Sequence, residues 1–205
     1  MSSDWEERYA AVERLWSGEP NEHLTRLAAA WRPGRSLDIG CGEGDDVLWL
    51  ASRGWQATGV DMSPTAVSRL RAGAAERGLG GVQGAVVDLT TQALPAGPFD
   101  LVTSFFVHGG PHEGSLVLED VLARAAGRAA LGGRLLTAVH CVNPPWHRHH
   151  VRVFRPEALA AEVLARLPEG AWKVETCEER WRDATGPDGE VGRRSDGVVC
   201  WRRVR

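Results

Sequence analysis

The stretch Leu37-Asp-Ile-Gly-Cys-Gly-Glu-Gly44 decides the fold of this 205-residue chain. It reads as the end of a buried strand, followed by three glycines and then by a helical pattern over residues 45–52. Glycine is needed where the backbone turns sharply beside a ligand, because it has no side chain. The spacing is G-x-G-x-G, whereas a dinucleotide loop would place its third glycine at the position of Asp45. A carboxylate there competes for the helix N-terminal donors that a pyrophosphate needs, so the loop favours a nucleoside without phosphates.

Downstream of this loop, short apolar runs alternate with amphipathic segments, which is typical of a parallel α/β sheet. We expect strands over residues 36–39, 56–60, 82–87, 99–106 and 133–141. Helices are expected over 45–52, 64–77, 115–130 and 155–167. The chain then closes with strands over 172–181 and 198–204, joined by a turn-rich segment. This short connection predicts that the last two strands pair in antiparallel fashion.

The segment before residue 34 is predicted to form two helices that precede the sheet. Trp5, Tyr9 and Trp16 recur at helical spacing and predict one aromatic face on a first helix. Asn21 is expected to cap a second helix that reaches Trp31. The aromatic face could close over a ligand or pack as a seam against the sheet.

The composition describes a globular protein without strong charge bias. Apolar residues make up 43% of the chain, and 24 basic against 27 acidic side chains give a net charge of −3. No positive field gathers phosphates, so we expect no nucleic-acid partner. The four cysteines lie far apart and predict neither disulfides nor a thiolate zinc site. With no apolar run of about 18 residues and no basic leader, we expect a cytoplasmic protein without membrane contact.

Acidic residues stand at the ends of three expected strands, at Asp38, Asp61 and Asp88. Ligands of open α/β sheets bind at the carboxyl ends of parallel strands, so these acids predict one acidic rim. Asp61 lies 17 positions beyond Gly44, where an acid can accept both hydroxyls of a ribose. An acidic rim attracts a cationic cofactor and repels phosphate, which selects a sulfonium nucleoside over NADP or ATP.

Together these residues resemble the class I S-adenosylmethionine (SAM) dependent methyltransferases. Residues 38–44 resemble the first motif of that family, and Gly59-Val-Asp61 resembles the second. The resemblance implies a doubly wound, Rossmann-like α/β fold with a seven-stranded sheet, mostly parallel with an antiparallel terminal strand, plus N-terminal helices. It implies one domain over residues 1–205, with 1–33 as a helical lid and 34–205 as the core. It also implies that SAM is bound by Asp38, Gly40, Cys41, Gly42, Gly44, Asp61, Met62, Asp88, Leu89 and Ser104.

The acceptor is expected to be a small molecule. Residues 49–55 resemble a subgroup that includes thiopurine and tellurite-resistance methyltransferases, whose acceptors are small. No Asn-Pro-Pro-Tyr type motif follows the fourth expected strand, and the similar residues 143–146 follow the fifth. In related enzymes that motif orients a planar nitrogen, and we do not assign this role to residues 143–146. We predict methyl transfer to sulfur, nitrogen or oxygen of an aromatic or thiol compound by a monomer or homodimer.

Histidines and aromatic residues follow the fourth and fifth expected strands, at the edge where the acceptor should lie. His108 and His140 are candidate general bases, because a neutral imidazole accepts a proton near pH 7. The residues expected to contact the acceptor are Trp5, Tyr9, Trp16, Phe105, Phe106, His112, Trp146 and Arg152. The histidines of residues 147–150 lie in a proline-rich loop and resemble a metal cluster only superficially, so we expect no metal.

Each assignment has a simpler alternative. Asp61 could cap the helix that begins near Pro64, and Asp88 could be an ordinary turn acid. The histidines could be hydrogen-bonded pocket walls rather than bases. At the level of function, the alternatives are a non-catalytic SAM-binding sensor or assembly protein, and a nicotinamide oxidoreductase, against which Asp45 argues.

Overall fold

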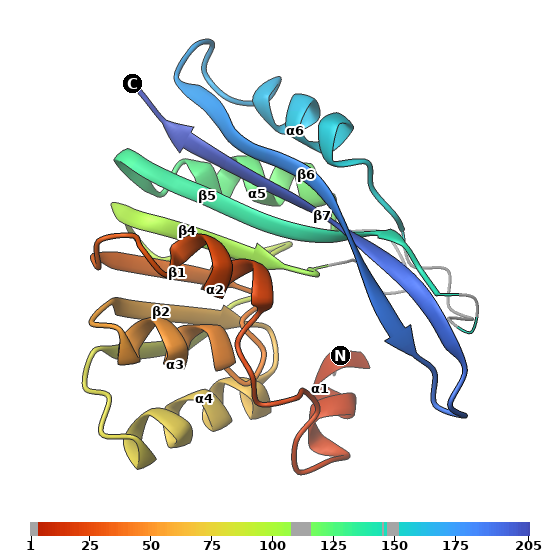
Figure 1. Ribbon diagram of the computed structural model, residues 1–205. Helices are drawn as coiled ribbons and strands as arrows, with labels where there is room; N and C mark the ends of the chain where they lie inside the picture. The colour runs from red at the N-terminus through yellow and green to blue at the C-terminus, as the bar shows by residue number, and fades with distance from the viewer. Residues whose placement is uncertain (1–3, 108–115, 145, 147–151) are drawn as a thin grey trace.

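The computed structural model describes residues 4–107, 116–144, 146 and 152–205, and its core is a single seven-stranded sheet (Figure 1). The strands are β1 (Arg35–Ile39), β2 (Gln56–Asp61), β3 (Val82–Val86), β4 (Phe99–Phe105), β5 (Ala129–Val142), β6 (Trp172–Thr185) and β7 (Val191–Arg203). The helices are α1 (Asp4–Ala10), α2 (Glu22–Ala28), α3 (Asp45–Ser52), α4 (Pro64–Glu76), α5 (Leu118–Ala126) and α6 (Pro156–Leu164).

The strand order is β3-β2-β1-β4-β5-β7-β6. Strands β1 to β5 pair in parallel, and β7 runs antiparallel to both β5 and β6. The order reverses at β1 and β4, which places the topological switch point beside the glycine loop. The predicted doubly wound, Rossmann-like fold with an antiparallel terminal strand is confirmed.

Helices cover both faces of the sheet (Figure 1). Apolar residues of α2, α3 and α4 form one buried cluster with Trp55, which precedes β2, and with side chains of β2, β4, β5 and β7 such as Leu101. A second cluster joins α5 and α6 to the opposite face around Phe99 and Trp201. Strands that are buried on both faces explain why the sequence shows near-continuous apolar runs. None of the helices in the described part of the chain is long and apolar enough to cross a bilayer.

The N-terminal helices are shorter than the sequence predicts. Asn21 caps α2 as expected, its side chain accepting from the His23 amide at 2.9 Å. However, α1 ends at Ala10 and α2 ends at Ala28, so Trp16 and Trp31 lie outside helices. The prediction that Trp16 shares a helical face with Tyr9 is wrong, because the backbone after α1 forms hydrogen bonds with the glycine loop instead of continuing the helix.

The last two strands are longer than predicted and form a two-stranded ribbon. β6 continues to Thr185 and β7 begins at Val191, and the ends of the two strands pair only with each other. In Figure 1 this ribbon extends beyond the rest of the sheet. The apolar pattern of the sequence does not reveal it, since these residues pack against no core and alternate irregularly.

Candidate functional site

The loop between β1 and α3 turns sharply at its glycines. Gly42 and Gly44 have φ angles of 53° and 88°, which side chains with a Cβ rarely adopt. A Cβ at Gly44 would also lie 2.3 Å from a methyl carbon of Leu70. The amide of Gly40 donates to the carbonyl of Val60 at 2.8 Å, which joins the loop to the end of β2. The structure thus brings the predicted glycines to the switch point of the sheet.

Asp61, at the end of β2, holds this loop in place. Its Oδ2 accepts from the Gly42 amide at 2.9 Å, and its Oδ1 accepts from the Ser63 amide at 2.9 Å. Burial raises the pKa of Asp61 in spite of these donors. The cap of α4 is Ser63, whose hydroxyl accepts from the Ala66 amide at 3.0 Å. The alternative role of Asp61 as that cap is therefore wrong, because the carboxylate is directed to the loop.

Two further carboxylates, Asp38 and Asp46, lie beside the glycine loop, and Asp38 is close enough to feel the charges of both Asp46 and Asp61. Asp38 is buried at the end of β1 and accepts from the Thr103 hydroxyl at 2.7 Å. Burial, and then the charge of Asp46, raise the pKa of Asp38 well above its usual value. Burial also raises the pKa of Asp46 to about 7, although the Asn21 amide donates to it at 2.6 Å. Mutually repelling carboxylates of this kind are stabilised by a nearby cation.

An aromatic cluster from the N-terminal segment lies on the glycine loop. The indole nitrogen of Trp16 donates to the Tyr9 hydroxyl at 2.8 Å. A Cβ at Gly42 would lie 2.8 Å from that hydroxyl and 3.0 Å from the indole nitrogen. The ring of Trp5 is centred 6.4 Å from the Tyr9 ring and 6.2 Å from the Trp16 ring. These three residues, which are predicted to contact the acceptor, thus form one cluster, and the Tyr9 hydroxyl and the Trp16 indole nitrogen of that cluster lie against Gly42 of the loop.

Glu43 anchors this segment, although sequence reasoning assigned it no role. Its carboxylate accepts from the amides of Leu15 and Trp16 at 3.1 and 3.0 Å, and from Arg69 Nη1 at 2.8 Å. Arg69, on α4, also donates to the Tyr9 carbonyl at 3.0 Å. Burial alone would raise the pKa of Glu43, but the two amides and Arg69 lower it. Its partners lie more than 25 residues away, so no local pattern marks the contact.

Asp88 and Leu89 follow β3 but are engaged locally. Asp88 Oδ1 accepts from the hydroxyl and the amide of Thr90 at 2.6 and 2.8 Å, and Oδ2 accepts from the Thr91 hydroxyl at 3.0 Å. These bonds lower the pKa of Asp88. Leu89 is buried in the hydrophobic core. The contacts match the alternative role of Asp88 as a turn acid, and an adenine contact by either residue stays a prediction.

The other predicted cofactor residues lie around the loop. Cys41 is half-buried, and burial raises the pKa of its thiol well above the usual value, so it is protonated at neutral pH. Met62, after β2, is 38% exposed. Ser104, near the end of β4, is fully buried, and its hydroxyl has no hydrogen-bond partner among the residues that the structure describes. Their contact with a cofactor stays a prediction.

A second group of polar residues surrounds Asp196 at the end of β5. His140 and Asp196 are register partners on β5 and β7, and Nδ1 of His140 lies 3.3 Å from Oδ1 of Asp196. Arg182, from β6, donates its Nε to Oδ2 of Asp196 at 2.8 Å. Burial alone would raise the pKa of Asp196, but the two histidines and nearby arginines hold it well below its usual range. Phe106 stacks on His140 with ring centroids 4.5 Å apart.

Phe106 holds its stacked position with a backbone conformation that is rare for such a side chain. Its φ is 53°, and no other non-glycine residue in the described ranges has a positive φ. Strained residues of this kind occur preferentially at functional sites. Two predicted residues, Phe106 and His140, are therefore placed together at the ends of adjacent strands, as expected.

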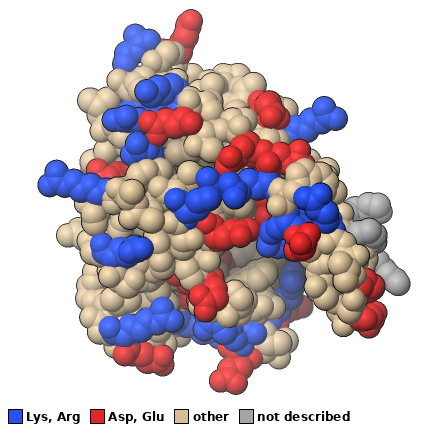
Figure 2. Space-filling model, viewed as in Figure 1, with Lys and Arg blue, Asp and Glu red and all other residues tan. Residues whose placement is uncertain are grey.

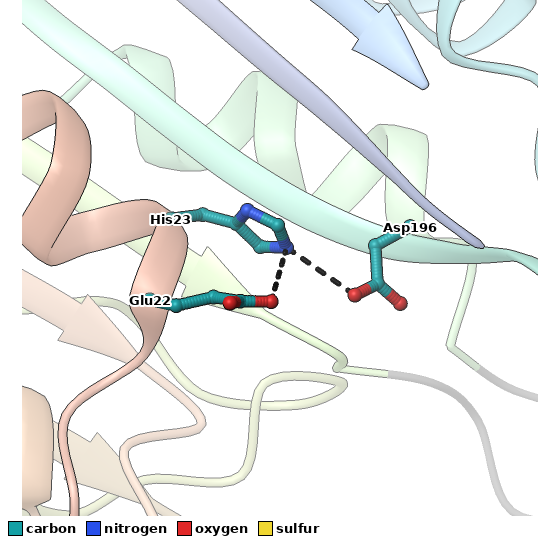
Figure 3. Close-up of side chains that lie close together, drawn as sticks. All are labelled: Glu22, His23 and Asp196. Carbon is teal, nitrogen blue, oxygen red and sulfur yellow. Dashed lines mark hydrogen bonds and ion pairs between the residues drawn. The ribbon is translucent and has the colours of Figure 1, made fainter. Parts of the chain in front are cut away.

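The close-up in Figure 3 shows that α2 contributes His23 and Glu22 to the same group. Nε2 of His23 lies 3.3 Å from Asp196 and 3.9 Å from Glu22, and the three ligand atoms lie within 4.8 Å of one another. This set could suggest a metal site. However, Arg182 donates to the same oxygen of Asp196 that faces His23 and lies 3.6 Å from Glu22. A guanidinium there already supplies the positive charge, which favours a hydrogen-bonded charge network.

The remaining predicted acceptor residues are less closely grouped. Phe105 is half-buried and packs against the core cluster beneath α2 and α3. Trp146 lies at the tip of the ribbon, 3.0 Å from where a Cβ on Gly186 would stand. Arg152 forms an ion pair with the buried Glu119 of α5, so its charge is neutralised away from the loop. His108, His112 and residues 147–150 lie outside the described residues.

Figure 2 shows the surface of the molecule in the view of Figure 1. This face is hollowed between the body of the molecule and the β6–β7 ribbon, and both acidic and basic side chains border the hollow. The start of α2 links the glycine loop to the Asp196 group, because the Asn21 amide donates to Asp46 and the next two residues, Glu22 and His23, belong to the Asp196 group.

Comparison with known proteins gives the same picture. Residues 37–128 match the methyltransferase domain family. The chain is 36% identical over 123 residues to the 2-heptyl-1-hydroxyquinolin-4(1H)-one methyltransferase of Mycobacteroides abscessus, covering 58% of this chain and 54% of that protein. It is 41% identical over 157 residues to the aklanonic acid methyltransferase DauC of Streptomyces sp. (strain C5), covering 72% of this chain and 66% of that protein. The chain thus spans between half and two thirds of these curated relatives.

Among solved structures, TehB from Haemophilus influenzae superposes with a TM-score of 0.73. The match covers 97% of this chain and 67% of that chain at 16% identity, so it shows a shared fold. The family match begins within β1 and takes in the glycine loop, Asp61 and Asp88. With this match, the two relatives and the sheet order, the chain belongs to the class I SAM-dependent methyltransferases, as its sequence predicts.

Proposed function

We propose that this protein binds SAM and transfers its methyl group to an oxygen, nitrogen or sulfur of a small aromatic or thiol molecule. The observation that carries the proposal is the group of carboxylates at the glycine loop, Asp38, Asp46 and Asp61, whose pKa values burial raises. SAM is cationic at its sulfonium and its amino group, so it would supply the positive partner that these buried carboxylates need. Asp61, already fixed by the loop, is the residue assigned to the ribose hydroxyls.

The transfer itself needs alignment more than chemical assistance. A lone pair of the acceptor atom forms the new bond to the methyl carbon, the carbon–sulfur bond breaks, and its electron pair stays on sulfur as neutral S-adenosylhomocysteine (SAH). The acceptor's proton leaves to a base or has already dissociated. Charge is consumed in this step, so excluding water favours it. The aromatic cluster of Trp5, Tyr9 and Trp16 is suited to this exclusion as part of the predicted lid.

His140 is the residue we assign as general base. If its Nδ1 donates to Asp196, the lone pair lies on Nε2, which is the tautomer a base requires. Phe106 fixes the plane of the ring from one side. The names of the two curated relatives denote small organic acceptors, one a hydroxyquinolinone and the other an acid. They support a small-molecule acceptor, and the state as monomer or homodimer stays a prediction.

The test separates binding from turnover. SAM and SAH binding are measured by calorimetry, and the protein is then incubated with methyl-labelled SAM and a panel of phenols, carboxylic acids, thiols, amines and azoles. We expect micromolar binding of both nucleosides and label in at least one panel compound. Binding with no SAH formed from any compound would support the alternative of a SAM-binding protein without turnover. The absence of SAM binding would refute the proposal.

A further inference from the structure

The β6–β7 ribbon presents a basic face to the Asp196 group. Arg182 and Arg194 are register partners, and so are Arg180 and Asp196. Partners in an antiparallel pair point to the same side, and so do residues two apart along a strand. Three arginines and one aspartate therefore share one face of the ribbon, and contact with His140 and His23 shows that this face is directed at the candidate acceptor site.

Two of these arginines have acidic partners. Arg182 donates to Asp196 at 2.8 Å, and Arg180 lies 3.6 Å from Glu178. Arg194 differs, because no acidic side chain among the described residues lies within ion-pair distance of it. It is nevertheless half-buried. Burial, and then the charge of Arg182, lower the pKa of Arg194, although the charges of Asp196 and Glu22 act in the opposite direction.

A half-buried guanidinium that faces a second arginine and has no direct ion pair is costly for the fold. Like charges directly opposite each other on paired strands are destabilising, and a charge removed from water needs a counter-charge or hydrogen bonds. Asp196 already serves Arg182 and both histidines. An anion bound between Arg182 and Arg194 would relieve both the repulsion and the loss of solvation.

The position of Arg194 connects it to the chemistry. Asp196 contacts Arg182 on one side and His140, the assigned base, on the other. A planar anion held by the ribbon would therefore lie next to His140 and the stacked ring of Phe106. Arginine suits this task because its planar fork donates two parallel hydrogen bonds to a carboxylate or a similar oxyanion.

We propose that Arg194, together with Arg182, binds an oxyanion of the acceptor, and that the acceptor is an aromatic acid carrying a carboxylate or an acidic enol beside the methylated atom. This inference rests on the proposed methyl transfer and narrows its acceptor class. It assigns the ribbon, which the family match over residues 37–128 does not include, to acceptor recognition.

The experiment compares matched acid and amide probes. Binding of salicylate and salicylamide, and of 1-hydroxy-2-naphthoate and its amide, is measured by saturation-transfer NMR and calorimetry, with and without SAH. The variants are Arg194→Gln and, as a matched control, Arg193→Gln. Arg193 lies on the opposite face of the same strand, over the Trp181 ring at 5.1 Å and 3.8 Å from Asp183. Both substitutions remove one charge from the exposed ribbon.

We expect wild type and Arg193→Gln to bind each acid about tenfold or more tightly than its amide, and Arg194→Gln to bind the two alike. Equal binding of acid and amide by wild type would overturn the inference, as would an Arg194→Gln variant that keeps the preference. Acetate or chloride, added at the same concentration as salicylate, should leave the binding of salicylate unchanged. If either anion weakens that binding, the ribbon attracts anions in general, and the inference is overturned. SAM binding and SAH formation are scored separately, so a wild-type protein that forms SAH but binds acid and amide alike refutes only this inference and leaves the proposed methyl transfer standing.

Discussion

The carboxylate of Glu43 lies 2.8 Å from Arg69 Nη1, and the same carboxylate accepts from the amides of Leu15 and Trp16. One buried acid of the cofactor loop therefore holds both α4 and the N-terminal segment. The closed position of the predicted lid therefore depends on this residue as well as on the packing of α1.

Replacing Glu43 by Ala should release the N-terminal segment without unfolding the sheet. The substitution leaves two amides and a guanidinium without their acceptor, at a local cost on the order of 2 to 4 kcal/mol. We expect hydrogen exchange at the Leu15 and Trp16 amides to accelerate more than tenfold, while amides of β1 and β4 keep their protection. Exposed Glu13, replaced by Ala in the same segment, is the control, and unchanged exchange at Trp16 would contradict the anchoring role.

The Gly42 position should tolerate no side chain. A Cβ there would meet the Tyr9 hydroxyl at 2.8 Å and the Trp16 indole at 3.0 Å, on a backbone with φ of 53°. Gly42→Ala should therefore displace the aromatic cluster and abolish measurable SAM binding. Gly78→Ala is the matched control, since Gly78 has φ of 64° with nothing within 4 Å of the added Cβ. It should lose only about 1 to 2 kcal/mol of stability from backbone strain and keep its SAM affinity.

Asp61 should be the strongest single contributor to cofactor affinity. Asp61→Ala should weaken SAM binding by about 2 to 4 kcal/mol, because about two charge-assisted hydrogen bonds to the ribose are lost. Part of that loss comes through the loop, whose Gly42 amide also depends on this carboxylate. Calorimetry on Asp61→Ala and Asp61→Asn measures both effects. A folded alanine variant with wild-type affinity would remove Asp61 from the site.

Asp46 should make the stability of the ligand-free protein depend on pH. Burial raises its pKa from 3.8 to about 7, so the folded state holds this proton more tightly than the unfolded state. Its contribution to stability is complete below the unfolded pKa and is lost as pH rises through about 7. We expect Asp46→Asn to gain stability relative to wild type as pH rises from about 5 to about 8. Urea unfolding across this range gives the difference, and a constant difference would contradict the assignment.

His140 should affect turnover and not cofactor binding. His140→Ala should lower kcat by roughly 10²-fold or more and remove the acidic limb of the pH–rate profile, while SAM affinity persists. Asp196→Asn tests the support of the ring and should shift that limb. Full activity of His140→Ala would mean that the acceptor ionises unaided, as a low-pKa thiol or an acid does.

The sheet was predictable because its pattern is local. Each parallel strand is a short apolar run, and the glycines and Asp61 stand directly at the strand ends, so topology alone brings them together. The residues that sequence reasoning missed make contacts across long separations. Glu43 meets Trp16 across 27 positions and Asp196 meets His23 across 173, and neither pair leaves a periodic signal.

The full length of the β6–β7 ribbon was not predicted for a related reason. The sequence predicts a second strand that begins only at residue 198, so Asp196 and Arg194 fall in the connection before it, to which no role was assigned. The prediction of a helix through Trp16 was wrong for another reason. Helical spacing does not reveal that the helix ends at Ala10 and that the Trp16 amide donates to Glu43 instead of to a further turn of helix.

The attachment of the N-terminal segment has a kinetic consequence. Glu6 contacts Ser63 and Thr65, Glu43 contacts Trp16, and Asp46 contacts Asn21, so three separate sets of hydrogen bonds hold one short stretch of chain against the glycine loop and α4. If SAM lies beneath it, spent SAH leaves only after these contacts break together. Product departure would then be the slowest step of the cycle, and solvent viscosity would govern the steady-state rate while a single turnover remained fast.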